Sequence, residues 1–324
     1  MNVGIDLSPL ALTRAGTARY LEGLLPQLRE RVALTGFRWG GGGRMTAAVR
    51  DLWWYPVALP LRARGVDVLH CPTFRAPLHA RVPLVLTVHD LAVLRHPDAF
   101  RRWSRAYGAV TVRRVIRAAA RVIAVSEFTR GEVVALAGVP EERVRVVPNA
   151  VGPPFAPEGP RAEGDYVLAV GTLEPRKNLP RLVDAVGRLG IELRVVGARG
   201  WGDVDVGGVE WLGAVDDDEL ARLYRGALCV AYPSLYEGFG IPVLEAMASG
   251  AAVVTSEGTA MADVADGAAV LVDPYDPAAI ADGIERAIAD REELGRRGVA
   301  RAAGYTWDAV AAATVRVYEE AAGA

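Results

Sequence analysis

The chain has 324 residues, of which 51% are hydrophobic, and a formal net charge of −2. That length is enough for two domains of ordinary size, each with its own core. No uninterrupted apolar run reaches the roughly 18 residues of a membrane-spanning helix, and the first residues enter a strand pattern directly, so neither a membrane span nor a signal peptide is expected. Cys71 and Cys229 lack metal-ligand spacing, which is typical of structural thiols in a cytoplasmic protein.

The small net charge hides an uneven division between the two halves of the sequence. Residues 1–150 contain 22 arginines and no lysine against 11 acidic residues, a balance of +11. Residues 151–324 contain 15 basic and 28 acidic residues, a balance of −13. This asymmetry predicts two domains with different partners, and the basic half favours an anionic acceptor or an anionic membrane surface.

Short β-branched runs alternate with helical stretches through both halves. In the first half the expected strands are 3–6, 66–70, 84–89, 121–125 and 143–147, and the expected helices are 17–31, 100–120 and 127–137. In the second half the expected strands are 166–170, 192–196, 209–212, 228–232, 251–255 and 269–272, and the expected helices are 179–189, 217–225 and 277–290. The alternation predicts parallel sheets flanked by helices, one in each half.

A stiff connector separates these halves. Residues 148–160 include five prolines, which favour an extended linker. The sequence therefore predicts two doubly wound α/β domains, residues 1–150 and 151–305, with a cleft between them. Ligands of such sheets bind beyond the carboxyl ends of the strands.

Two glutamates flank a glycine turn that opens a helix. In Glu237-Gly-Phe-Gly-Ile-Pro-Val-Leu-Glu245, a turn precedes the first helical residues. The N-terminus of a helix offers backbone N–H groups and a positive dipole end to a phosphate or a sugar hydroxyl. Carboxylates about two helical turns apart suit acceptors for hydroxyl protons of a nucleotide sugar better than an acid/base pair acting on one bond. The alternative is an ordinary strand–loop–helix unit with two solvated glutamates.

A second loop carries the only lysine of the chain. Gly171-Thr-Leu-Glu-Pro-Arg-Lys-Asn-Leu179 follows an expected strand and precedes an expected helix. Positive charge at the start of a helix opposes the helix dipole unless an anion binds there. Arg176 and Lys177 are therefore predicted to contact phosphate, and the alternative is a surface pair of cations.

Both stretches resemble those of a known family. Residues 232–250, with the two glutamates, the glycine turn and the trailing small-residue helix in order, resemble the donor-site signature of family 4 glycosyltransferases of the GT-B fold. The loop after Gly171 resembles the phosphate-binding loop of that family, although Thr172 stands where many members carry an arginine. The GT-B fold consists of two Rossmann-like doubly wound domains with an interdomain cleft, and in the family a final helix, here residues 306–322, crosses back onto the N-terminal domain.

The resemblance implies a retaining, metal-independent hexosyltransferase that uses a nucleotide sugar as substrate and needs no cofactor. Lys177 and Arg176 would stabilise the departing diphosphate, Glu237 would hold the sugar hydroxyls, and His89, which ends a strand of the first half, would position the sugar. The remaining donor-binding residues are predicted to be Gly16, Thr17, Gly171, Val215, Gly238, Phe239, Gly240, Ile241 and Glu245, with Glu245 on the ribose and Val215 at the base.

The donor and the acceptor are less closely defined. The form of the 171–178 loop resembles that of mannosyltransferases that build bacterial polysaccharides, which favours GDP-mannose over a UDP-sugar. The acceptor is a glycan, a lipid-linked or a small molecule, and no nucleic-acid partner is expected. Two alternatives stay open: a nucleotide-sugar epimerase of the GT-B fold, and a non-catalytic nucleotide-sugar-binding module.

Four weaker features complete the sequence predictions. Asp216-Asp-Asp218 is better explained by the dipole of a helix start than by a metal site, so no metal is predicted. Ser126 is predicted to cap a helix, and His70 is a candidate for the acceptor side. The arginine-rich stretch 100–117 would suit either peripheral association with an anionic membrane or a solvated helix face.

Overall fold

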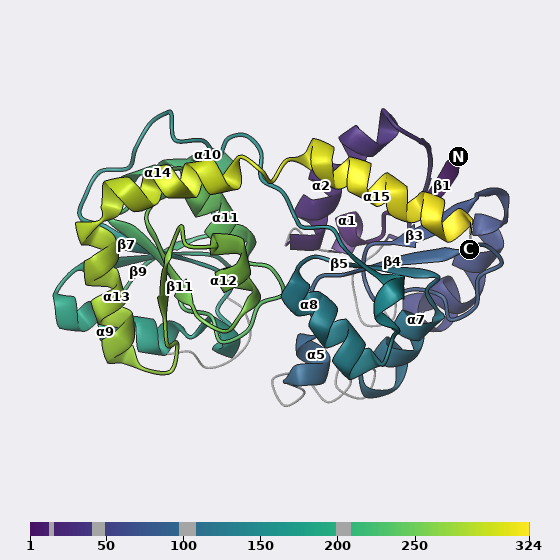
Figure 1. Ribbon diagram of the computed structural model, residues 1–324, viewed down its shortest axis with the longest axis horizontal. Helices are drawn as coiled ribbons and strands as arrows, with labels where there is room; N and C mark the ends of the chain where they lie inside the picture. The colour runs from purple at the N-terminus through teal and green to yellow at the C-terminus, as the bar shows by residue number, and fades with distance from the viewer. Residues whose placement is uncertain (13–15, 41–48, 97–107, 199–208, 324) are drawn as a thin grey trace. The chain divides into compact units, whose positions relative to one another are not determined.

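The computed structural model describes residues 1–12, 16–40, 49–96, 108–198 and 209–323. These residues form two compact units (Figure 1), one of residues 1–150 with 307–324 and one of residues 151–306. None of the helices in the described ranges has the length and hydrophobicity needed to cross a lipid bilayer.

The first unit is built on a parallel sheet of six strands. Its strands run in the order β2-β1-β3-β4-β5-β6. Their bounds are β1 (Asn2–Asp6), β2 (Ala33–Phe37), β3 (Val68–Cys71), β4 (Leu84–Val88), β5 (Arg121–Ala124) and β6 (Val144–Val146). Strand β2 was not expected, because its sequence Ala-Leu-Thr-Gly-Phe lacks the β-branched run that marks the other strands.

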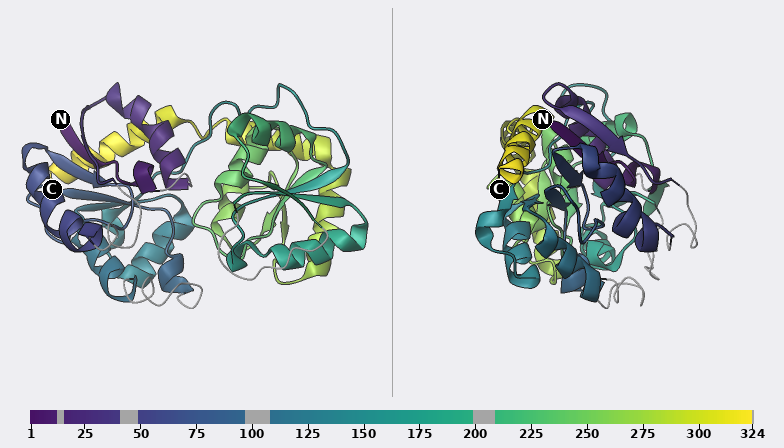
Figure 2. Two further views of the ribbon diagram at one scale, coloured as in Figure 1. Left: turned by 180° about the vertical axis from the view of Figure 1, so that it is seen from behind. Right: turned by 90° about the vertical axis from the view of Figure 1, so that its right-hand side faces the viewer.

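Side chains that alternate along these strands enter two separate cores. On one face Val3, Ile5 and Val85 pack with α2 (Gly16–Arg29) and α15 (Trp307–Ala322). On the other face Leu69, Leu86 and Val122 pack with helical segments from the middle of the unit (Figure 2). The helical segments between β1 and β6 other than α2 are α1 (Pro9–Leu12), η1 (Arg50–Ala58), α4 (Leu59–Arg62), η2 (Ala63–Gly65), α5 (Ala92–Arg95), η4 (Gly108–Val112), α7 (Arg113–Ala118), α8 (Glu127–Glu132), η5 (Val133–Ala137) and η6 (Glu141–Arg143).

The last helix of the chain packs on this N-terminal sheet. In α15 the Tyr318 hydroxyl lies 2.7 Å from His70 Nδ1, and Asp308 accepts a bond of 2.5 Å from Arg31. Gly23 of α2 lies against the Trp307 ring, where a Cβ atom would come within 2.1 Å of a ring carbon. The C-terminal helix therefore belongs to the first unit and begins at Trp307.

The second unit is also built on a six-stranded parallel sheet, in the order β12-β11-β10-β7-β8-β9. Strands β7 and β10 are neighbours at the point where the chain order reverses, which is where ligands of doubly wound sheets bind. The strands are β7 (Tyr166–Val170), β8 (Glu192–Val196), β9 (Glu210–Gly213), β10 (Cys229–Tyr232), β11 (Val253–Ser256) and β12 (Val270–Val272). The helical segments are η7 (Pro175–Lys177), α9 (Leu179–Leu189), α10 (Asp217–Gly226), α11 (Ile241–Ala248), α12 (Ala260–Ala265), α13 (Pro277–Ala289) and α14 (Arg291–Ala302).

Candidate active site

The loop that carries Lys177 leaves the carboxyl end of β7 and is fixed by its neighbour Asn178. The Asn178 backbone adopts φ of +61°, and its buried side-chain amide donates to the carbonyl oxygens of Pro233 (3.0 Å) and Pro274 (2.6 Å). The Arg176 carbonyl accepts a bond of 2.8 Å from the Leu235 backbone N–H. These bonds join the loop after β7 to the loop after β10, so two motifs about 60 residues apart form one site.

A third loop supports the backbone of Gly171. Gly197, directly after β8, has φ of +149°, and a Cβ atom there would lie 2.1 Å from the Gly171 carbonyl oxygen. The Gly171 N–H donates to the Val196 carbonyl at 2.8 Å. Only glycine allows this approach. Sequence reasoning missed Gly197, whose one signal is a glycine at the end of a β-branched strand.

The two predicted phosphate-binding cations both contact Glu237. Lys177 Nζ lies 2.6 Å from Glu237 Oε1, and an Arg176 guanidinium nitrogen lies 2.8 Å from Glu237 Oε2. The Lys177 and Glu237 side chains are 15% and 11% exposed. Arg176 also pairs with Glu174 at 2.8 Å. The structure thus brings together the three residues of this unit for which a catalytic role is predicted.

The charges in this cluster fix its protonation. Burial alone would raise the pKa of Glu237, but the adjacent Lys177 ammonium and Arg176 guanidinium outweigh it and lower that pKa to about 2. Burial would lower the pKa of Lys177, yet Glu237 and Tyr232 raise it above its ordinary value. At neutral pH the cluster therefore holds a carboxylate between two cations.

The glycine turn after Glu237 leads directly into α11. Gly240 has φ of +99° and precedes the helix, which begins at Ile241 with a proline in its first turn. Phe239 of the same turn is buried, and the centroid of its ring lies 6.0 Å from the centroid of the Tyr305 ring. Gly238 completes the turn, and the three residues connect Glu237 to the N-terminus of α11.

Glu245 lies farther along α11 and is only 3% exposed. Its Oε2 atom accepts a bond of 3.2 Å from the Tyr224 hydroxyl of α10.

Helix α10 itself is capped by Asp216, whose side chain accepts from the Glu219 N–H at 2.9 Å. Asp216 thus has the helix-start role expected from the sequence, and the described residues contain no group of three or more candidate metal ligands. Val215 directly precedes this cap, after the edge strand β9.

The other predicted site residues belong to the first unit. His89 directly follows β4, is half-buried, and donates from Nε2 to the Pro72 carbonyl at 3.1 Å. Burial lowers the pKa of His89 to about 4, so the ring is neutral at physiological pH. Gly16 and Thr17 are the first residues of α2. Ser126 caps α8 as expected, accepting from the Thr129 N–H at 3.0 Å.

His70 corrects one expectation. It was a candidate for the acceptor side, but it is fully buried, and its ring nitrogens contact the hydroxyls of Tyr318 (2.7 Å) and Thr87 (2.8 Å). The position at a strand end suggested a ligand contact, whereas the C-terminal helix covers it. His70 therefore links the sheet to α15.

We predict that His70 stays uncharged in the folded protein down to about pH 5. Burial and the nearby His89 lower the pKa of His70 from 6.5 to about 3. Below the unfolded pKa, the unfolded chain binds more protons than the folded one. The contribution of His70 to the free energy of unfolding is therefore fully present above pH ~6.5 and declines by up to about 1.4 kcal/mol per pH unit as the pH falls toward the folded pKa. NMR titration of the imidazole protons tests this, with the His70 resonances assigned by replacing the other three histidines singly. A His70 midpoint near pH 6.5 in the folded protein would contradict it.

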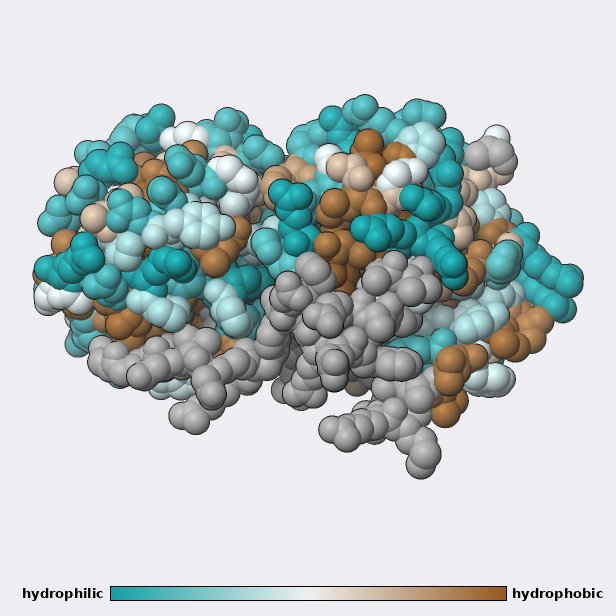
Figure 3. All heavy atoms as spheres, turned by 90° about the horizontal axis from the view of Figure 1, so that it is seen from below, coloured by the Kyte–Doolittle hydropathy of each residue, from teal (hydrophilic) through white to brown (hydrophobic). Residues whose placement is uncertain are grey.

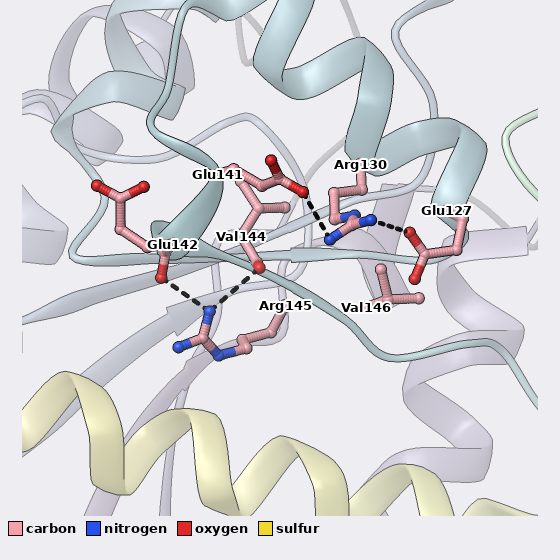
Figure 4. Close-up of a pocket in the computed structure, with 7 residues that line it drawn as sticks. All are labelled: Glu127, Arg130, Glu141, Glu142, Val144, Arg145 and Val146. Atoms are coloured by element: carbon pink, nitrogen blue, oxygen red, sulfur yellow. Dashed lines mark hydrogen bonds and ion pairs between the residues drawn. The ribbon is translucent and has the colours of Figure 1, made fainter.

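A separate hollow of about 630 Å³ lies in the first unit and is lined by Glu127, Arg130, Glu141, Glu142, Val144, Arg145 and Val146. As Figure 4 shows, Arg130 lies between Glu127 (2.7 Å) and Glu141 (3.0 Å). Arg145 donates to the Glu142 carbonyl at 2.8 Å and pairs with Glu320 at 2.9 Å. The lining of the hollow has three glutamates and two arginines, so its net charge is negative and does not favour an anionic ligand.

Models of glycosyltransferase families match nearly the whole chain. Residues 15–153 match Glycosyltransferase Family 4, and residues 155–303 match Glycosyl transferases group 1. The O-antigen chain mannosyltransferase B of Escherichia coli is 32% identical over 78% of this chain and 74% of its own length. The MMP alpha-(1->4)-mannosyltransferase of Mycolicibacterium hassiacum is 32% identical over 74% of this chain and 66% of its own length.

Solved structures agree on the fold. Sucrose-phosphate synthase from Thermosynechococcus elongatus superposes with a TM-score of 0.79 at 18% identity, covering 98% of both chains. HepE from Anabaena, solved with UDP and glucose, gives a TM-score of 0.76 at 19% identity, covering 97% of this chain and 98% of its own. The two Rossmann-like units thus form the GT-B fold. With the family models and the mannosyltransferase relatives, they show that the chain belongs to glycosyltransferase family 4.

Proposed function

We propose that this glycosyltransferase moves a hexose from a nucleotide sugar to an acceptor with retention of configuration and without a metal ion. The convergence of Lys177 and Arg176 on Glu237 at the β7–β10 switch point carries the proposal. Two cations beside a glycine turn and a helix start would bind a diphosphate, and a carboxylate between them would accept hydroxyl protons of the attached sugar.

The proposed roles follow from the distribution of charge. As the bond from the sugar to the diphosphate breaks, negative charge develops on the diphosphate, and Lys177 and Arg176 would stabilise it. Glu237 and the backbone of Gly238, Phe239, Gly240 and Ile241 would hold the sugar. Of the other predicted contacts, Glu245 would hold the ribose, Val215 the base, Gly171, Gly16 and Thr17 the diphosphate, and His89 would position the sugar.

Retention would follow a displacement in which the acceptor enters on the face that the diphosphate leaves. The acceptor oxygen forms the new bond to the anomeric carbon, the diphosphate oxygen keeps the electron pair of the broken bond, and the acceptor proton passes to the diphosphate. We propose no covalent sugar–enzyme intermediate, because the carboxylate of Glu237 is held by both cations.

GDP-mannose is the favoured donor. The curated relatives reported above are a chain mannosyltransferase and an α-mannosyltransferase, whereas HepE was solved with UDP, so a UDP-sugar is the second candidate. The O-antigen relative also favours a glycan or lipid-linked acceptor over a free small molecule.

A donor panel tests the function. GDP-mannose, UDP-glucose and UDP-N-acetylglucosamine would each be tested for thermal stabilisation, since a ligand that binds only the folded state raises the unfolding temperature. The stabilising donor would then be incubated with glycan acceptors in EDTA, and the anomeric configuration of the product determined by NMR. If the donor sugar is isomerised in the absence of an acceptor, the protein is an epimerase. If a donor binds without turnover, the protein is a non-catalytic module. A product of inverted configuration would overturn retention.

We further propose that the first unit associates peripherally with anionic membranes. Residues 100–107 of the arginine-rich stretch lie outside the described residues, and Arg113 and Arg117 of α7 donate to backbone carbonyls of residues 136 and 137.

A better candidate is the apolar surface of η1 and α4, formed by Leu52 (75% exposed), Trp53, Val57 and Leu61. In the view of Figure 3, hydrophobic residues reach the surface of both units among hydrophilic ones. Residues 52–66 contain two arginines and no acidic residue, which suits an anionic lipid interface.

Flotation with vesicles tests this association. The protein is expected to float with phosphatidylglycerol vesicles at low salt and not with phosphatidylcholine vesicles, because the attraction is electrostatic and screened by salt. Leu52→Glu should reduce the bound fraction several-fold. Tyr275→Glu, at a residue that is 62% exposed in the second unit, is the matched control and should leave it unchanged. No flotation at any salt concentration would disprove the proposal.

A further inference from the structure

The hydroxyl of Tyr232 lies inside the cluster of cations and carboxylate. Tyr232 is the last residue of β10 and is 4% exposed. Its hydroxyl accepts a hydrogen bond from Lys177 Nζ and donates one of 3.2 Å to Glu237 Oε1. The ammonium also lies 4.7 Å from the centroid of the Tyr232 ring. No role was predicted for this residue from the sequence.

The roles of donor and acceptor in this triangle are fixed by chemistry. An ammonium only donates and a carboxylate only accepts, so the Tyr232 hydroxyl must accept from Lys177 and give its own proton to Glu237. Lys177 also donates to Glu237 Oε1 at 2.6 Å. Two of the three ammonium N–H groups are thereby used. Among the described residues the third has no protein acceptor.

We propose that Tyr232 is a positioning residue for Lys177, which it and Glu237 hold by two N–H groups so that the third is directed to a phosphate oxygen of the donor. The phosphate part of this inference rests on the proposed function. A lysine ammonium sits on a flexible four-carbon stem, and a single ion pair leaves it free to rotate. A second bond removes that freedom before the substrate binds, and pre-aligned donors are the ones that stabilise developing charge effectively.

The hydroxyl is separable from the rest of the side chain. The Tyr232 ring is buried, and the Tyr232 carbonyl accepts from the Thr255 hydroxyl at 3.0 Å. Tyr232→Phe keeps the ring, the backbone bond and the contact between ammonium and ring, so the variant is expected to fold. Tyr166→Phe is a matched control, because the Tyr166 hydroxyl of the neighbouring strand donates to the Leu223 carbonyl at 2.8 Å and contacts none of the cluster residues.

The single lysine of the chain allows a direct test by NMR. Protein made with carbon-13 labelled lysine and a lysine-free tag gives signals from Lys177 alone. In the wild type the two Hε protons are expected to be resolved, because a fixed ammonium keeps them in different surroundings. In Tyr232→Phe they should move together toward a single averaged signal, and in Tyr166→Phe they should stay as in the wild type. A Tyr232→Phe spectrum that superposes on the wild-type spectrum would overturn the proposal.

Binding of GDP and UDP gives the second readout. The nucleotide that binds the wild type more tightly is used for the comparison. Calorimetry should show a Kd about 5- to 10-fold higher in Tyr232→Phe, which corresponds to the loss of one hydrogen bond, and a nearly unchanged Kd in Tyr166→Phe. In a Lys177→Met background, Tyr232→Phe should add less than about two-fold, since residues that act through one another are not additive. An equal loss in both backgrounds would overturn the positioning role. If neither nucleotide binds the wild type, the proposed function fails, and the NMR test of the Lys177 contact still stands.

Discussion

Replacing Lys177 by methionine is expected to lower hexosyl transfer by about 10³-fold, because removal of one pre-organised charge donor from an active site typically has an effect of this size. Lys177 is the only lysine of the protein. It lies in the loop after β7, where its ammonium contacts Glu237 and the Tyr232 hydroxyl. Methionine fills a similar volume without charge. The fold should persist, since Glu237 keeps its contact of 2.8 Å with Arg176.

The measurement is kcat/KM for the donor identified in the panel, together with the unfolding temperature. Arg188→Met is the control, because it removes a cation from α9 whose partner, Asp184 at 3.0 Å, is on the half-exposed face of the same helix. A surface pair of this kind contributes little to stability, about 0–1 kcal/mol, and nothing to the site. Transfer close to the wild-type rate in a folded Lys177→Met protein would refute the leaving-group role.

Local chemistry explains why much of the second unit was predictable from sequence. The strands 166–170 and 192–196 and the helix 179–189 begin and end where the pattern placed them. Lys177 and Arg176 were proposed because positive charge at a helix start needs a partner or a ligand, and Glu237 because it precedes a glycine turn that opens a helix. These signals lie within a few residues of one another, so a single sequence carries them.

Contacts between distant segments were not predictable in the same way. The Asn178 bonds to Pro233 and Pro274 and the approach of Gly197 to Gly171 depend on how loops of different strands meet. His70 was misassigned because the Tyr318 hydroxyl that covers it is 248 residues later in the chain. Sequence patterning gives the period and the ends of elements, whereas the partners of a side chain at a strand end follow from the assembled sheet and helices.

Replacing Glu237 by glutamine is expected to separate donor binding from transfer. The carboxylate lies 2.6 Å from the Lys177 ammonium and 2.8 Å from the Arg176 guanidinium, so it neutralises part of the charge that a diphosphate would meet. Glutamine keeps an oxygen acceptor for Lys177 and removes the negative charge. Nucleoside diphosphate should therefore bind a few-fold more tightly, because an anion is removed from beside its phosphates.

Transfer by Glu237→Gln should nevertheless fall by about 10²- to 10³-fold, because the charged acceptor for the sugar hydroxyls is lost and charge-assisted hydrogen bonds are the strong ones. Glu174→Gln is the control: it removes a carboxylate that lies 2.8 Å from Arg176 and forms no ion pair with the Lys177 ammonium, and its transfer should stay within a few-fold of wild type. The pKa of Glu237 at about 2 means that the wild-type carboxylate stays ionised from pH 5 to 8, so protonation of this group should leave no step in the pH profile there. Calorimetry with GDP and UDP and steady-state kinetics measure both quantities. Nucleotide affinity and transfer that fall together would show that Glu237 only holds the cations, and unchanged transfer would remove it from the sugar site.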